Sequence, residues 1–167
     1  MRIESLLVDA NNRVPAQVQW NPLLVEDLLL EACVLDFRYV PQTSSVGVLL
    51  DLRTALQIDE GNTGLLIVEN TLKMAISIDK PHGAMVSTIV GSVPDTDTPA
   101  TYGIEIACMP AAVITIAGQR ALFHVGNVDG IGDAQPMLEG EEFPTEGFQR
   151  WESDIALVYT TDSLSRS

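Results

Sequence analysis

Two apolar runs joined by a polar turn constrain the fold of this chain more than any other stretch. Residues 46–56 (VGVLLDLRTAL) are apolar apart from Asp51, Arg53 and a threonine, and residues 65–68 (LLIV) form a second apolar run. The turn between them, residues 59–64 (DEGNTG), is rich in Asp, Gly and Asn. Apolar runs of strand length separated by such a cluster are typical of neighbouring β-strands. We therefore expect these two strands to form the middle of a sheet.

The remaining strands are predicted from alternation of apolar and polar residues. This pattern predicts strands over residues 14–20, 34–40, 65–69, 72–78, 85–93, 102–109, 112–117 and 121–125. Gly118-Gln119 is a two-residue hairpin signal, and residues 3–8 are either a short strand or a fraying segment. The fold class expected is α+β, mostly β: an antiparallel meandering sheet with one short helix and an irregular acidic C-terminal arm, in a single domain over residues 1–167.

The expected helix covers residues 22–30. Asn21 is a favourable N-cap, Pro22 suits the first helical position, and Glu26 and Asp27 lie in the first turns. An alternative interpretation is one long strand over residues 28–40, entered through a turn.

Four charged side chains lie on two consecutive predicted strands. Asp36 and Arg38 lie together on one face of the first strand, and Asp51 and Arg53 lie together on one face of the second. If the strands form a hairpin, we expect a cross-strand charge ladder, each pair contributing about 0.2–1 kcal/mol. The alternative is a polar patch that binds a ligand.

Charge is the strongest functional signal. The chain has 23 acidic and 9 basic residues, a formal net charge of −14. Such a field disfavours nucleic acid and anionic membrane surfaces and favours a basic protein partner, although it also serves solubility alone. No apolar run reaches the roughly 20 residues of a membrane-spanning helix, and no signal peptide is evident, so we expect a cytoplasmic protein. Cys33 and Cys108 are expected to be reduced core thiols.

The acidic arm covers residues 126–154 and contains the candidate binding residues. It is too polar to form a core, so we expect it to wrap the sheet, held by Trp151 and the apolar residues 155–159. The residues predicted to bind a partner are Asp129, Asp133, Glu139, Glu141, Glu142 and Glu146.

No catalytic, cofactor or metal residues are predicted. His82 lies in a Pro-His-Gly turn, and a Cys108–His124 nucleophile would need both side chains beside an orienting carboxylate. Asn127, Asp129 and Asp133 recur as in a calcium loop but lack the fifth and twelfth ligands of an EF-hand, so we expect a turn.

Two stretches, DLRTALQ…EGNTGLLIV at residues 51–68 and FHVGNVDGI at residues 123–131, resemble a group of small, acidic, uncharacterised bacterial proteins. The resemblance extends from about residue 31 to residue 131 and implies no catalytic residues. Some small acidic α+β bacterial proteins are immunity proteins that block toxins, which is an analogy of type.

Three functions therefore remain open. The first is a non-enzymatic protein-binding module, of the immunity or adaptor type, whose acidic face meets a basic protein. The second is a small ligand-binding protein or enzyme with a pocket beneath the arm. The third is a structural subunit that uses an unpaired edge strand as its contact.

Overall fold

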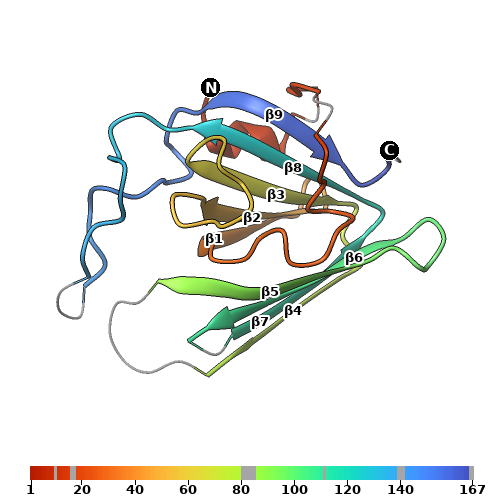
Figure 1. Ribbon diagram of the computed structural model, residues 1–167. Coiled ribbons are helices and arrows are strands. Elements are labelled where there is room, and N and C mark those ends of the chain that lie inside the picture. Colours follow the sequence, from red (N-terminus) through yellow and green to blue (C-terminus); the bar gives the residue numbers. More distant parts are fainter. Residues whose placement is uncertain (10, 16–17, 80–85, 111, 139–141, 166–167) are drawn as a thin grey trace.

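The computed structural model describes residues 1–9, 11–15, 18–79, 86–110, 112–138 and 142–165 (Figure 1). Nine strands form one antiparallel sheet in the order β4-β7-β6-β5-β1-β2-β3-β8-β9. The described residues contain one helical segment, the 3-10 helix η1 (Ile3–Leu7). The strands are β1 (Cys33–Val40), β2 (Ser45–Asp51), β3 (Thr63–Glu69), β4 (Lys73–Ile78), β5 (Ser87–Asp95), β6 (Tyr102–Met109), β7 (Ala112–Gly118), β8 (Arg120–Asn127) and β9 (Ala156–Asp162). The expected mostly β, antiparallel fold is confirmed.

The sheet folds over into two layers (Figure 1). Strands β1, β2, β3, β8 and β9 form the first layer, and β5, β6, β7 and β4 form the second. The layers are joined where β1 meets β5 through the residue pairs Cys33↔Thr88 and Val34↔Ser87. The larger hydrophobic core contains side chains from both layers, because each layer turns one apolar face toward the other.

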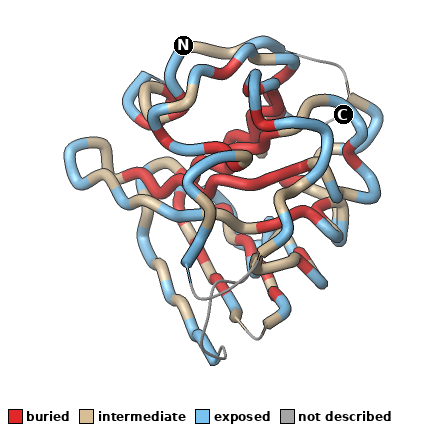
Figure 2. Tube along the Cα trace, turned by 90° about the vertical axis from the view of Figure 1, so that its left-hand side faces the viewer, coloured by how far each residue is buried: buried red, intermediate tan, exposed pale blue. Residues whose placement is uncertain are grey.

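Strands β2 and β3 are buried on both faces. All seven residues of β2 and six of the seven residues of β3 are buried, and Figure 2 shows buried backbone through the centre of the molecule. Their outer face is covered by η1 and the C-terminal arm in a second core cluster. A Cβ atom at Gly47 would lie 2.4 Å from Leu7 Cδ2, so glycine allows η1 to pack this closely. Double-sided burial explains why these strands are continuous apolar runs.

The predicted central residues lie in the core. Val48, Leu50, Leu66 and Val68 have no exposed surface and Leu52 is 2% exposed. The prediction that the runs at residues 46–56 and 65–68 form the middle of the sheet is confirmed for residues 46–51 and 65–68. Strand β2 ends at Asp51, so the rest of the first run lies outside the sheet.

The Gly118-Gln119 hairpin prediction is wrong. Strand β7 pairs with β6 and β4, whereas β8 pairs with β3 and β9, so these two residues carry the chain from one layer to the other. The crossing is tight: a Cβ atom at Gly118 would lie 2.6 Å from Val68 Cγ1 and 2.7 Å from the Glu69 carbonyl oxygen. Glycine is required by this close approach and not by a hairpin turn.

The N-terminal predictions also need correction. The described residues between 14 and 20 form no strand; the backbone of this segment runs along the edge of β9, where Thr160 N–H donates to the Val14 carbonyl oxygen at 2.6 Å. Asn21 caps a turn, since its Oδ1 accepts from the Leu23 N–H at 3.0 Å, but residues 22–31 continue as turns. Positive φ at Asp27 and Glu31 (60° and 64°) is incompatible with a helix. The long strand over residues 28–40 is absent as well, because β1 begins at Cys33.

Candidate functional site

The candidate site is the acidic arm, predicted over residues 126–154. Its first two residues belong to β8, and the described residues from 128 to 155 connect β8 to β9 without regular secondary structure. A buried ion pair at the end of β2 holds it. The Asp51 side chain is fully buried and that of Arg53 is 3% exposed. The guanidinium donates from Nη2 to Asp51 Oδ2 at 2.7 Å and from Nε to Oδ1 at 3.0 Å. This planar fork positions the remaining N–H groups of Arg53 for further bonds.

Those remaining donors bind the backbone of the arm. Arg53 Nη1 donates to the carbonyl oxygens of Ile131 at 2.8 Å and Ala134 at 3.0 Å, and Nη2 donates to that of Gly147 at 2.8 Å. The guanidinium also lies 5.5 Å from the centroid of the Phe148 ring. One side chain therefore fixes three points of the arm, and these points come from both of its ends.

Asn62, just before β3, is a second anchor. Its side chain bonds the Val128 backbone in both directions, accepting from N–H and donating to the carbonyl oxygen, each at 2.9 Å. The Asn62 carbonyl oxygen accepts from Gln149 Nε2 at 2.7 Å. The start and the end of the arm are thus tied to the same residue.

Trp151 is the third anchor, as predicted, but the charge ladder is wrong. Trp151 Nε1 donates to Asp36 Oδ2 at 2.7 Å, and the Arg38 guanidinium lies 4.7 Å from the Trp151 ring centroid. Across the β1–β2 pair Asp36 faces Leu49 and Arg38 faces Gly47, so neither lies opposite Asp51 or Arg53. Both charged pairs bind other segments of the chain, because the register of the hairpin keeps them apart.

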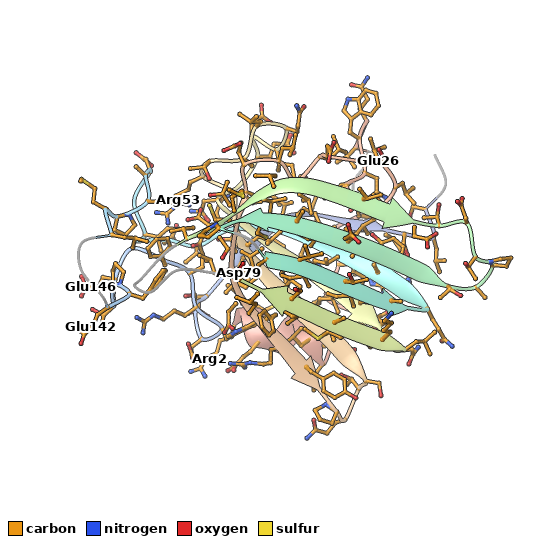
Figure 3. The ribbon with its side chains drawn as sticks, turned by 90° about the horizontal axis from the view of Figure 1, so that it is seen from below. Arg2, Glu26, Arg53, Asp79, Glu142 and Glu146 are labelled. Carbon is orange, nitrogen blue, oxygen red and sulfur yellow. The ribbon has the colours of Figure 1, made fainter. Side chains whose placement is uncertain are left out.

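The arm presents its acids to solvent. Asp129, Asp133, Glu142 and Glu146 are all exposed, and Figure 3 shows Glu142 and Glu146 pointing away from the sheet at the end of the molecule where Arg53 lies. The predicted site residues Glu139 and Glu141 lie outside the described residues. The four described site acids therefore belong to the segment whose backbone Arg53 contacts at Ile131, Ala134 and Gly147.

A cavity of about 350 Å³ lies between the arm and the outer face of β1. Its lining combines apolar and charged side chains: Leu35, Asp36, Arg38, Leu49, Phe143, Pro144, Phe148, Gln149, Arg150, Trp151 and Glu152. The rings of Phe143 and Phe148 pack at a centroid distance of 4.7 Å at one side of it.

Cys108 and His124 do not form a reactive pair. Cys108 faces the main core between the layers. His124 is two residues from Leu122 along β8, so it lies on the same face as Leu122, which points away from the main core. Burial, and then the charge of Cys33, raise the pKa of the Cys108 thiol to about 11. Burial, and then the charge of Arg13, lower the pKa of His124 to about 4, and its Nδ1 lies 2.9 Å from Thr160 Oγ1. Both cysteines are buried and free.

No group of three or more His, Cys, Asp or Glu side chains in the described residues is placed to hold a metal ion. Asn127 and Asp129 are exposed at the start of the arm, and Gly130 and Gly132 adopt positive φ, as expected of a turn. His82 lies outside the described residues. Among the described residues, no helix has the length and apolar character needed to cross a membrane.

Comparisons of the chain with protein-family models, curated proteins and solved structures found no match.

Proposed function

We propose that this chain is a non-enzymatic protein-binding module that presents its acidic arm to a basic protein partner, as an immunity or adaptor protein does. One observation carries the proposal: exposed acids stand on a backbone fixed at three points by Arg53. A preorganised charged loop loses less conformational entropy on binding than a mobile one. Its field speeds encounter with a basic surface, while nucleic acid and anionic membranes are repelled.

The anchoring favours a recognition surface over a solubilising tail. Solubility requires only net charge, which a disordered segment supplies equally well. Here a buried ion pair, Asn62 and Trp151 all hold the arm. Immobilising a segment whose exposed side chains are mainly acidic is consistent with a surface that must keep its shape.

The test is a salt series of binding kinetics with the basic product of a neighbouring gene as the first candidate partner. The variant carries Asp129→Asn, Asp133→Asn, Glu142→Gln and Glu146→Gln. We expect a slower on-rate and a flatter salt dependence with an unchanged melting temperature, because these side chains are exposed and steer encounter. Extending the variant to Glu139 and Glu141 tests the complete predicted set.

The matched control removes four exposed acids that lie outside the arm: Glu26, Asp95, Asp97 and Glu105. Its total charge equals that of the arm variant, so a general field effect slows both proteins equally. Equal kinetics for the two variants would refute recognition by the arm and leave solubility as the role of the charge.

The cavity beneath the arm favours a second candidate, a small ligand-binding protein. Arginine and aromatic side chains line it, and its volume of about 350 Å³ lies within the range of small-molecule sites. Ligand binding there should change the fluorescence of Trp151. A ligand screen in which Phe143→Ser, which alters the cavity lining but keeps Trp151, abolishes the response tests this candidate against the protein-binding one.

A further inference from the structure

A continuous apolar groove runs between β1 and β4. One hollow of about 590 Å³ is lined by Phe37, Tyr39 and residues 71–74 with Ile76. A second, of about 250 Å³, is lined by residues 34–37, Ile76 and Ile78 among others. Phe37 and Ile76 line both hollows, which therefore join into one groove.

Each wall of this groove is a strand with one side that is largely unpaired in the described residues. β4 is the last strand of the sheet order and pairs with β7 alone in the described part of the chain. Among the described residues, β1 pairs with β5 through Cys33 and Val34, and no described strand lies beside the later residues of β1 on that side. Edge strands present backbone N–H and C=O groups that another extended segment can satisfy.

The two edge strands of the sheet, β9 and β4, differ in whether another segment covers their outer edge. The edge of β9 is covered, since Pro15 forms a bridge with Thr160 and Val14 exchanges hydrogen bonds with the same residue. The edge of β4 has no such cover among the described residues. Leu72, just before β4, is 66% exposed, and Ile78, its last residue, is 58% exposed. Natural proteins protect an edge strand that has no partner.

The charges around the groove are arranged unevenly. Asp36 and Asp79 flank the end where Ile78 lies, whereas Lys73 lies at the other end. Phe143 of the arm also lines the Ile78 end, and Figure 3 places Asp79 at the same end of the molecule as Glu142. The groove therefore opens onto the acidic arm.

We propose that the groove binds an extended segment of a basic protein, added as an antiparallel strand to the edge of β4. The segment has alternating apolar side chains, which pack against Phe37, Met74 and Ile76, and it carries Lys or Arg at its N-terminal end. An antiparallel segment begins beside the end of β4, where Asp79 and the arm lie. β4 is the pairing strand because its register is regular, whereas β1 has a bulge between Val34 and Asp36.

A second copy of this chain is less favoured as the molecule that binds in the groove. Each copy carries a net charge of −14, so two copies repel one another, whereas a basic segment is attracted. The proposal rests on the proposed function only in taking the partner to be basic.

Three capped, fluorescently labelled peptides of one composition test the groove. KKVTVTVTV has the expected alternation with the lysines first, VTVTVTVKK has the lysines last, and KKVVTTTVV lacks the alternation. We expect the first to bind most tightly by fluorescence anisotropy. The difference in affinity between KKVTVTVTV and VTVTVTVKK should shrink as salt rises, because it is electrostatic. The difference in affinity between KKVTVTVTV and KKVVTTTVV should persist, because it comes from the alternation of apolar side chains.

Variants locate the binding. Leu72→Ser and Phe37→Ser should each weaken KKVTVTVTV by about tenfold, as loss of an apolar anchor does. Leu56→Ser is the matched control, since Leu56 is 67% exposed and does not line the groove. Methylating alternate backbone nitrogens of the peptide, in two complementary sets, should abolish binding for at least one set, because that set donates to β4.

The outcomes separate the two proposals. Equal binding of KKVTVTVTV and KKVVTTTVV, or insensitivity to both groove variants or to both methylated sets, overturns strand addition whatever the salt dependence. A different result would support strand addition at the groove and refute recognition by the acidic arm. In that case an uncharged VTVTVTV peptide binds and is weakened by Leu72→Ser, but the position of the lysines and Glu142→Gln have no effect on binding. Concentration-dependent dimerisation that excludes the peptide would assign the groove to a second copy and overturn the proposal.

Discussion

Replacing Arg53 with Met removes the anchor of the arm while keeping a side chain of similar length. The variant leaves the fully buried Asp51 carboxylate without its charge partner. Removing one partner of a buried ion pair costs about 3–5 kcal/mol. The variant also removes the hydrogen-bond donor of three backbone carbonyl oxygens, those of Ile131, Ala134 and Gly147. Each loss costs about 1–3 kcal/mol if the oxygen stays buried without contact to water. Release of the arm into water avoids most of this second cost, so we expect a loss near 3–5 kcal/mol together with a mobile arm.

Two measurements follow from this calculation. Urea denaturation gives the free energy of unfolding, and a protease that cleaves after Glu, read by mass spectrometry, reports cleavage at Glu142 and Glu146. The double variant Asp51→Leu with Arg53→Met separates the two effects. It removes the unpaired buried charge, so stability should partly recover, but the arm should stay sensitive to cleavage because its donors are still absent.

Arg150→Met is the control, since Arg150 is an exposed arginine of the same arm. Its effect on stability should stay within about 0.5 kcal/mol, as for most surface substitutions. If Arg53→Met behaves like Arg150→Met in both assays, Arg53 does not hold the arm.

Three further predictions concern the core, a buried histidine and the turn at the start of the arm. Leu50→Ala should cost about 2–5 kcal/mol in thermal or urea unfolding, since Leu50 is fully buried; an unchanged midpoint would contradict its central position. The pKa of His124 is lowered from 6.5 to about 4 in the folded state, so protonation of this side chain favours the unfolded state. About 3 kcal/mol of the free energy of unfolding is therefore present above pH 6.5 and is lost as the pH falls to 4. In unfolding curves over this range His124→Gln should lose less stability than the natural protein, and parallel losses would refute the assignment. Millimolar calcium should leave the melting temperature unchanged, because a ligand of the native state must raise it; a shift of several degrees would make Asp129 and Asp133 ligands.

The sequence predicts which face of a strand is buried better than it predicts which strand lies beside it. The apolar runs that contain Leu50 and Leu66 correctly placed both residues in the core, because burial on both faces leaves a continuous apolar run. The alternation over residues 34–40 placed Asp36 and Arg38 on a strand but did not give their register against Asp51, since a shift of pairing leaves the local pattern unchanged. Gly118-Gln119 has the composition of a tight turn, yet turn chemistry does not specify which strand the chain joins next.

The anchor of the arm was only partly visible in the sequence. Trp151 was correctly expected to hold the arm, because a large aromatic side chain in a polar segment needs an apolar surface. The role of Arg53 was missed, although the signal was present: a charged pair inside an otherwise buried run must find buried partners. The groove beside β4 depends on which strands remain unpaired, a property of the whole sheet that no local pattern records.

The pairing of Glu69 with Arg120 has a consequence for the order of folding. These residues face one another across β3 and β8, and all of residues 70–119 lie between them in the chain. Forming that pair closes a long loop, whereas the β1-β2-β3 meander closes only short ones, so the meander should form first. Until β8 has been synthesised and pairs with it, β3 is an apolar edge strand without its neighbour, and its segment TGLLIVE is then open to aggregation.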